Sequence, residues 1–218
     1  KFIERRKTLI AELLDVLLPG EAIDTGHSGL SGFEARYGLA SKPVQIRFRI
    51  LDDALAMAGL TDLTVPADEF ARLKLDADRV FVVENEINGL AFPPVKRGLA
   101  VFRLGYAVDL LAGARWLGDR QLHYWGDIDT HGFAMLDRFR AAFPNAKSFL
   151  MDRDTLIANQ DQWTHEATKH VAPLQRLSPA EAALFDELRF DRLARGVRLE
   201  QERIPFGQVT GAIDLAIA

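Results

Sequence analysis

Four short apolar runs in the second half of the chain constrain its fold more than any other feature. Helical patterns lie between them, over 106–118 and 131–142. Strands that alternate with helical patterns of roughly 10–15 residues are typical of βαβ units and a parallel sheet. The chain is therefore predicted to be α/β, with a parallel sheet flanked by helices. The four runs are VFVVEN (80–85), GLAVFRLG (98–105), QLHYWGD (121–127) and KSFLMD (147–152).

The first 75 residues have a different pattern. Apolar residues recur at helical spacing over 3–18, and a second short helical stretch covers 30–38. In QIRFRI (45–50), apolar residues alternate with arginines, which predicts a strand. Short helices followed by a strand resemble a small winged-helix-like unit. We expect this unit over 1–75 and the α/β domain over 76–218, with a C-terminal helical extension that begins at Ser178-Pro179.

Acidic side chains follow two of the predicted strands. Glu84 lies at the end of the first run, and Asp127 and Asp129 lie at the end of the third. In open α/β sheets, ligands bind beyond the carboxyl ends of the strands. Carboxylate oxygens suit Mg²⁺ or Mn²⁺, which can polarise a phosphoryl oxygen and activate water. These residues are therefore the candidate catalytic and metal-binding groups.

Several nearby residues have two interpretations. Glu86 is either a second-metal ligand or a residue that caps the following helix. His131 either assists proton transfer or lies in the first turn of a helix without a chemical task. Asp152 is either a further ligand or a helix cap. The sequence Asp127-Ile-Asp129-Thr also fits the start of haloacid-dehalogenase phosphatases, in which Asp127 would be the nucleophile, and it equally fits an ordinary acidic turn.

Charge and composition leave nucleic-acid binding open. The net charge of −4 does not exclude local basic patches. Candidate DNA-contacting residues fall in two groups, each with the alternative of being a solvated face: Lys42, Arg47 and Arg49, and the loop residues Lys96 and Arg97. That loop leads into the second strand, so its alternative position is the edge of the sheet opposite to Glu84.

The location and the extent of the protein are also predicted from composition. The chain of 218 residues has no cysteine and no run of eighteen apolar residues, so we expect a cytoplasmic protein without a membrane span. The start, KFIERRKTLI, has neither an initiator Met nor a signal-peptide pattern. We therefore expect a fragment of a longer protein.

The motifs resemble known families. A glutamate at one strand end and Asp-x-Asp at a later one resemble the Toprim domain of topoisomerases, primases and some nucleases. The segments VVENEINGLAFP (82–93), YWGDIDTHGFAMLDR (124–138) and SFLMDRDTL (148–156) resemble the C-terminal half of the JetD family, also called MksG. FIERRKTLIAELLDVLLP and FEARYGLASKPVQIRFRILD are similar to the same family, so the resemblance covers nearly the whole chain.

The resemblance implies a function and a fold. JetD proteins are nuclease subunits of Wadjet plasmid-defence systems, so it implies a metal-dependent endonuclease that cuts double-stranded plasmid DNA delivered by an SMC-like JetABC (MksBEF-type) complex. The implied fold is a Toprim-type, Rossmann-like sheet after a winged-helix (CAP-like) unit, similar to the A subunit of topoisomerase VI. Full-length members have a further N-terminal region, through which a homodimer is expected.

The resemblance also assigns residues. Glu84 matches the Toprim glutamate, and Asp127 and Asp129 match the Asp-x-Asp pair. Topoisomerase VI uses a catalytic tyrosine, but Tyr37 lies in a context (FEARYGL) that does not match it. Hydrolysis by activated water is therefore expected. The alternatives are the phosphatase that uses Asp127, and a non-catalytic module that docks DNA or the complex and whose acids are structural.

Overall fold

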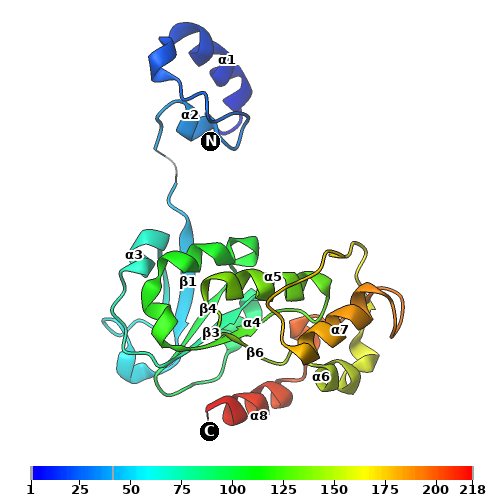
Figure 1. Ribbon diagram of the computed structural model, residues 1–218. Coiled ribbons are helices and arrows are strands. Elements are labelled where there is room, and N and C mark those ends of the chain that lie inside the picture. Colours follow the sequence, from blue (N-terminus) through cyan, green and yellow to red (C-terminus); the bar gives the residue numbers. More distant parts are fainter. Residues whose placement is uncertain (1, 41, 218) are drawn as a thin grey trace. The chain divides into compact units, whose positions relative to one another are not determined.

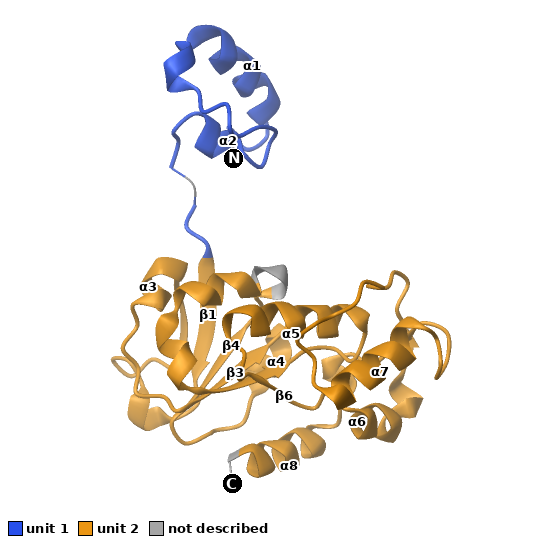
Figure 2. Cartoon of the chain, in the orientation of Figure 1, with its two compact units in different colours: residues 1–44 blue, residues 45–218 orange. Residues whose placement is uncertain are grey.

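The computed structural model describes residues 2–40 and 42–217 (Figure 1). The chain divides into two compact units, Lys1–Val44 and Gln45–Ala218 (Figure 2). The predicted domain boundary lay at 75/76, whereas these units divide at 44/45. The reason is that residues 45–66 form two strands that join the same sheet as the later strands. The winged-helix identity of the first 75 residues stays a prediction.

The first unit is helical. Its elements are α1 (Lys7–Leu17), η1 (Gly20–Ala22) and α2 (Phe33–Arg36). Tyr37 joins the two α-helices, because its hydroxyl lies 2.8 Å from Asp15 Oδ1 and 3.1 Å from the carbonyl oxygen of Ala11. Arg36 also pairs with Asp15, at 2.8 Å. The Tyr37 hydroxyl therefore takes part in packing α1 against α2.

The second unit is built on a six-stranded sheet in the order β2-β1-β4-β3-β5-β6. Neighbouring pairs among β4, β3, β5 and β6 are parallel, and β1 is antiparallel to both β2 and β4. The predicted parallel sheet is thus confirmed for β3 to β6, whereas β1 and β2 extend it with antiparallel pairs. The strands are β1 (Gln45–Ile50), β2 (Asp62–Pro66), β3 (Arg79–Val83), β4 (Gly98–Phe102), β5 (Gln121–Trp125) and β6 (Lys147–Ser148).

Helices flank this sheet (Figure 1). Every residue of β4 is buried, as expected for a strand covered on both faces. Inside the core, Phe81 packs against Phe92 and His123, with ring centroids 4.7 and 5.0 Å away. The α-helices of this unit are α3 (Ala67–Ala71), α4 (Glu86–Ala91), α5 (Thr130–Ala142), α6 (Arg153–Ala158), α7 (Pro179–Arg189) and α8 (Phe206–Ile217).

The stretch predicted as one helix over 106–118 contains two 3₁₀-helices, η3 (Gly105–Gly113) and η4 (Arg115–Asp119). Gly113 and Gly118, which lie within them, lower α-helix propensity, while Leu111 and Leu117 still reach the core. The predicted start of α7 is confirmed, since Ser178 and Glu181 form a reciprocal capping box. The other short 3₁₀-helices are η2 (Asp53–Leu55), η5 (Gln160–Gln162) and η6 (Gln201–Arg203).

A second small sheet brings the C-terminal region to the end of β5. It pairs β7 (Thr164–His165) with β8 (Val197–Arg198) in antiparallel fashion. Leu199, next in the chain, exchanges two backbone hydrogen bonds with Ile128, at 2.9 and 3.1 Å. Among residues 2–40 and 42–217, no helix is long and apolar enough to cross a membrane.

Candidate functional site

The three predicted acids lie at neighbouring strand ends. Val83 pairs with Trp125 in the parallel register of β3 and β5, so the residues that follow these strands meet at one edge of the sheet. The backbone N–H of Glu84 donates to the carbonyl of Trp125 at 3.1 Å. Glu84 therefore lies beside the loop that contains Asp127 and Asp129.

The surroundings of Glu84 change the pKa of its carboxyl group. Burial and, to a smaller extent, the charges of Asp127 and Asp129 raise its pKa to about 7, against the opposing effects of the backbone N–H of Asp127 and of Arg198. Its Oε2 is buried and has no hydrogen-bond partner among the residues that the structure describes. Glu84 is thus a carboxyl group that can hold or release a proton near neutral pH.

Both carboxylate oxygens of Asp127 are bound. Oδ2 lies 2.5 Å from Nη2 of Arg198, and Oδ1 accepts a hydrogen bond from the backbone N–H of Gln201 at 3.0 Å. Both partners belong to the segment that begins at β8, more than 70 residues away. The C-terminal region therefore completes the surroundings of this aspartate.

Asp129 begins α5. Its Oδ1 accepts a hydrogen bond from the backbone N–H of Gly132 at 2.7 Å, which is an N-cap, and its Oδ2 lies 3.1 Å from Nε of Arg198. Burial raises the pKa of Asp129 to about 6; the Gly132 N–H and Arg198 oppose this, and the charges of Glu166 and Asp127 add to it. A Cβ at Gly132 would overlap the backbone of Asp127, so this turn requires glycine.

Gln201 was missed by sequence reasoning. It is 1% exposed, and its side-chain carbonyl accepts from the backbone N–H of Asn85 at 3.0 Å while its amide donates to the carbonyl of Trp125. It thus ties the end of β3 to the end of β5, and with them Glu84 to Asp127. A lone glutamine in a polar segment carries no periodic signal by which it could have been found.

Glu166 and Arg198 were also missed. Glu166 is buried and accepts hydrogen bonds from the backbone N–H and the hydroxyl of Thr130, at 3.1 and 2.6 Å. It contributes a further negative charge beside Asp129. Arg198 brings a positive charge to both Asp127 and Asp129.

The donor set fits a hard divalent cation, because carboxylate oxygens are the ligands that Mg²⁺ and Mn²⁺ prefer. The unpartnered Oε2 of Glu84 is a further observation in favour. Within residues 2–40 and 42–217, however, no three acidic or histidine side chains stand ready as a ligand group. The guanidinium of Arg198 contacts both aspartates at the place where an ion would have to approach them.

Glu86 is held apart from this group by two arginines. Its carboxylate lies 2.5 Å from Nη1 of Arg47 and 3.5 Å from Nε of Arg103. The cap of α4 is Asn85, whose side chain accepts from the backbone N–H groups of Ile87 and Asn88. A role of Glu86 in binding a second metal ion stays a prediction.

The predicted DNA-contacting residues are dispersed over the molecule. Arg47 pairs with Asp62 as well as with Glu86, and Arg49 donates to the carbonyl of Phe92 at 2.9 Å. In the first unit, Lys42 lies 3.0 Å from Glu4. Arg47 and Arg49 are thus engaged by neighbouring groups of the protein.

Lys96 and Arg97 lie at the other edge of the sheet from Glu84. They precede β4, whose first residue pairs with the first residue of β3. Arg97 contacts both Asp76 and Asp78, the former at 2.6 Å, while Lys96 is exposed. The loop thus lies at the strand ends opposite to Glu84, which was one of its two expected positions.

The two remaining candidates have structural partners. Asp152 caps α6 by accepting from the backbone N–H of Thr155 at 2.7 Å, so the capping interpretation is confirmed. His131 lies in the first turn of α5, and its Nε2 is 3.0 Å from the carbonyl oxygen of Thr168. Neither contact leads toward Glu84.

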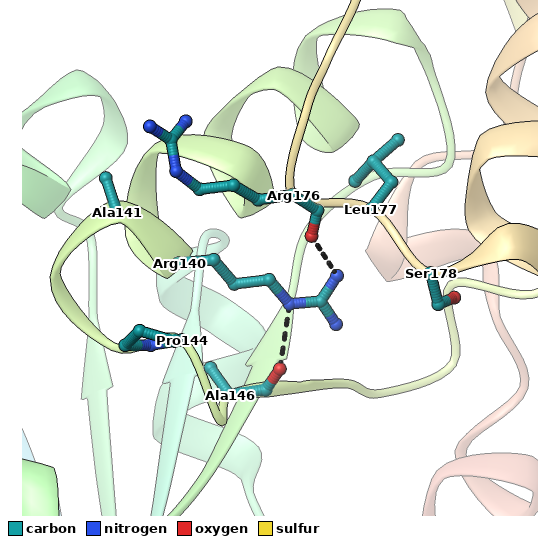
Figure 3. Close-up of a pocket in the computed structure, with 7 residues that line it drawn as sticks. All are labelled: Arg140, Ala141, Pro144, Ala146, Arg176, Leu177 and Ser178. Atoms are coloured by element: carbon teal, nitrogen blue, oxygen red, sulfur yellow. Dashed lines mark hydrogen bonds between the residues drawn. The ribbon is translucent and has the colours of Figure 1, made fainter.

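A pocket of about 580 Å³ lies at the opposite end of α5 from Asp129 (Figure 3). Its wall includes Arg140, whose guanidinium donates to the carbonyls of Ala146 and Arg176, at 2.8 and 2.9 Å, as drawn in the figure. The same guanidinium pairs with Glu181. The positive charge of Arg140 in the pocket wall is therefore neutralised by Glu181, and the pocket is separate from the acidic site.

Comparisons with known proteins agree with the motifs. A search of curated proteins finds no match. Residues 38–213 match the model of one family, described as Wadjet protein JetD, C-terminal. The matched range includes the strand ends with Glu84, Asp127 and Asp129, and also Arg198 and Gln201. Because the match covers most of the chain, the protein belongs to the family of Wadjet JetD C-terminal regions.

Proposed function

We propose that this chain is the catalytic part of a divalent-metal-dependent DNA endonuclease that cuts plasmid DNA by water-mediated hydrolysis. The observation that carries the proposal is the meeting of Glu84, Asp127 and Asp129 at the ends of β3 and β5, where burial and the two aspartates bring the pKa of Glu84 to about 7. A carboxyl group with such a pKa suits proton transfer at neutral pH.

Each residue has a task in this proposal. Asp127 and Asp129 would hold the Mg²⁺ or Mn²⁺ ion, with Glu84 as a further ligand or as the base that accepts a proton at Oε2. Bound there, the ion would supply charge neutralisation and activation of water. Gln201 keeps the two strand ends at a fixed separation, because its side chain bonds to both of them.

Family membership supports the partners. As a Wadjet JetD C-terminal region, the chain would act with an SMC-like JetABC complex on double-stranded DNA. The six-stranded, mainly parallel sheet with acids at the carboxyl ends of β3 and β5 is compatible with a Toprim-type domain. Arg103, which follows β4 and whose side chain is 68% exposed, carries positive charge on this unit for phosphate contacts.

One observation favours the non-catalytic alternative, a module that docks DNA or the complex. Arg198 already pairs with Asp127 and Asp129, as it would in a purely structural ion-pair network. The two functions differ in metal binding, since the docking module binds no divalent ion. The phosphatase alternative has no comparable support, because the family match is to Wadjet JetD C-terminal regions.

Plasmid cleavage by the complete Wadjet complex with Mg²⁺ or Mn²⁺ tests the nuclease proposal. We expect Glu84→Gln and Asp127→Asn to lower the cleavage rate at least about 100-fold, the scale of losing a general base or a metal ligand. Glu187→Gln is the control, because Glu187 on α7 pairs with the surface residue Arg153, and we expect it to cleave at close to the wild-type rate. Unchanged cleavage by Glu84→Gln would contradict the proposal.

A further inference from the structure

The guanidinium of Arg198 lies between the two aspartates that would hold a metal ion. Its Nη2 is 2.5 Å from Oδ2 of Asp127, and its Nε is 3.1 Å from Oδ2 of Asp129. Two carboxylates this close to one cation share its charge, which offsets the repulsion between them. Arg198 therefore supplies in the protein the positive charge that a metal ion would otherwise bring.

The contact with Asp129 is electrostatic and is not directed as a hydrogen bond. Nε of Arg198 finds no aligned acceptor among the described residues, although Asp129 is within ion-pair distance. The third nitrogen, Nη1, is 3.4 Å from Oε1 of Glu200, a carboxylate that also pairs with Arg203 at 2.8 Å. Glu200 offers the guanidinium an acceptor other than the two aspartates.

The backbone around Arg198 is held by contacts that do not involve its side chain. Leu199 exchanges two hydrogen bonds with Ile128, and the buried side chain of Gln201 is bonded to the residues at the ends of β3 and β5. The Arg198 side chain is about one-third exposed. The side chain can consequently leave the aspartates while the segment from β8 to η6 stays in place.

We propose that Arg198 is an exchangeable counter-ion, which neutralises Asp127 and Asp129 until a divalent cation displaces it. The inference rests on the proposed function for the presence of that cation. Loss of a charge-assisted pair opposes metal binding by roughly tenfold to a hundredfold in affinity. Arg198 thus sets the concentration of divalent ion at which the site fills.

Mn²⁺ binding to the 218-residue chain tests the inference without any cleavage assay. Calorimetric titrations would compare wild type with Arg198→Gln, which keeps a polar side chain but removes the charge. We expect Arg198→Gln to bind Mn²⁺ at least about tenfold more tightly. Arg195→Gln is the control, since Arg195 is an exposed arginine three residues before Arg198, and its affinity should equal that of wild type. Asp127→Asn marks the site, because it should abolish binding.

The outcomes separate the two proposals. If wild type binds Mn²⁺ and Arg198→Gln binds it equally or more weakly, Arg198 is not a competing counter-ion, while the metal proposal survives. If neither binds, both proposals fail together. Circular dichroism checks folding, and if Arg198→Gln does not fold, Arg198→Lys replaces it. Its ammonium lacks the two-pronged donor geometry, so the pair weakens and Mn²⁺ should bind more tightly than to wild type. An affinity no higher than wild type would then overturn the inference.

Discussion

The backbone N–H of Gln201 donates a hydrogen bond to Oδ1 of Asp127 at 3.0 Å, across a separation of 74 residues in the chain. The side chain of Gln201 meanwhile joins the ends of two parallel strands. One residue therefore positions the aspartate directly and fixes its distance from Glu84.

Replacing Gln201 by Ala should destabilise the protein and the site together. The change removes two buried side-chain hydrogen bonds and leaves the backbone N–H of Asn85 unpaired, while the carbonyl of Trp125 keeps the hydrogen bond from Glu84, so it costs about 2–3 kcal/mol. Urea denaturation measures the free energy of unfolding. Gln162→Ala is the control, because the side-chain amide of Gln162 donates to the exposed side chain of Asp161, and its effect should stay below about 0.5 kcal/mol.

Removing the charge of Glu84 should stabilise the folded protein at high pH. The pKa of this carboxyl is raised from 4.5 to about 7, so its contribution to stability is present below pH 4.5 and is lost as the pH rises through 7. Glu84→Gln stays neutral and should be about 1–3 kcal/mol more stable than wild type at pH 8. The difference should vanish at pH 4.5. Equal stability of Glu84→Gln and wild type at pH 8 would show that the ionised carboxylate does not destabilise the folded protein.

Mn²⁺ affinity should rise with pH up to about 7. The ion must displace the protons that Glu84 and Asp129 hold below their raised pKa values, so binding at pH 6 should release about one proton from Glu84 and about half a proton from Asp129. Calorimetry in buffers of different ionisation enthalpy counts the released protons. Glu84→Gln should lose this step and retain only the part due to Asp129, whose pKa is about 6.

His123 should make the protein sensitive to mild acid. Burial, with Lys147 and Arg79 nearby, lowers its pKa from 6.5 to about 4. The unfolded chain therefore takes up a proton first, and stability is lost as the pH falls from 6.5 through 4. Its ring stacks on Phe81 at 5.0 Å, so His123→Phe preserves the ring contact. Over this pH interval, the unfolding free energy of that variant should fall by about 1–3 kcal/mol less than that of wild type. An unchanged slope would assign the acid sensitivity to other groups.

The buried pair of Arg140 and Glu181 should matter more than a surface pair. Burial alone would raise the pKa of Glu181, but hydrogen bonds from Arg140, Ser148 and the backbone of Ser178 hold it at about 2. This contribution is present above pH 4.5 and is lost as the pH falls toward 2. Glu181→Ala leaves the buried Arg140 without its partner and should cost about 3 kcal/mol in urea denaturation at pH 7.

The matched surface pair is that of Arg153 with Glu187, at 2.9 Å. Its arginine side chain is about half exposed, so solvent screens the interaction. Glu187→Ala should therefore cost less than about 1 kcal/mol. Equal losses in Glu181→Ala and Glu187→Ala would mean that the carbonyl contacts of Arg140 suffice to hold it.

The sequence predicts those parts of the fold that repeat locally. The apolar runs that became β3, β4 and β5 and the helical pattern of α5 are each contained in a single stretch. The position of Glu84 and Asp127 at adjoining strand ends follows from the same runs, because parallel strands bring their carboxyl ends together. Local signals sufficed for these elements.

The remainder depends on contacts between distant segments. The alternation in β1 identifies a strand, but it does not say that this strand pairs antiparallel with β4. Arg198, Gln201 and Glu166 reach the site only because the β7–β8 pair and the bridge of Leu199 with Ile128 bring their segments to the end of β5. Isolated polar residues in short strands and turns carry no periodicity, so nothing in the sequence distinguishes them from a solvated loop.

The glycine at position 132 allows this arrangement to be recognised from a sequence pattern. Because a side chain there would overlap the backbone of Asp127, the pair of aspartates can be followed by helix α5 only when the third residue after Asp129 is glycine. The pattern Asp-x-Asp-x-x-Gly, preceded by Glu after a buried strand, is thus a stricter search string than Asp-x-Asp alone. It is a way to separate related chains from the many unrelated proteins in which two aspartates merely share a turn.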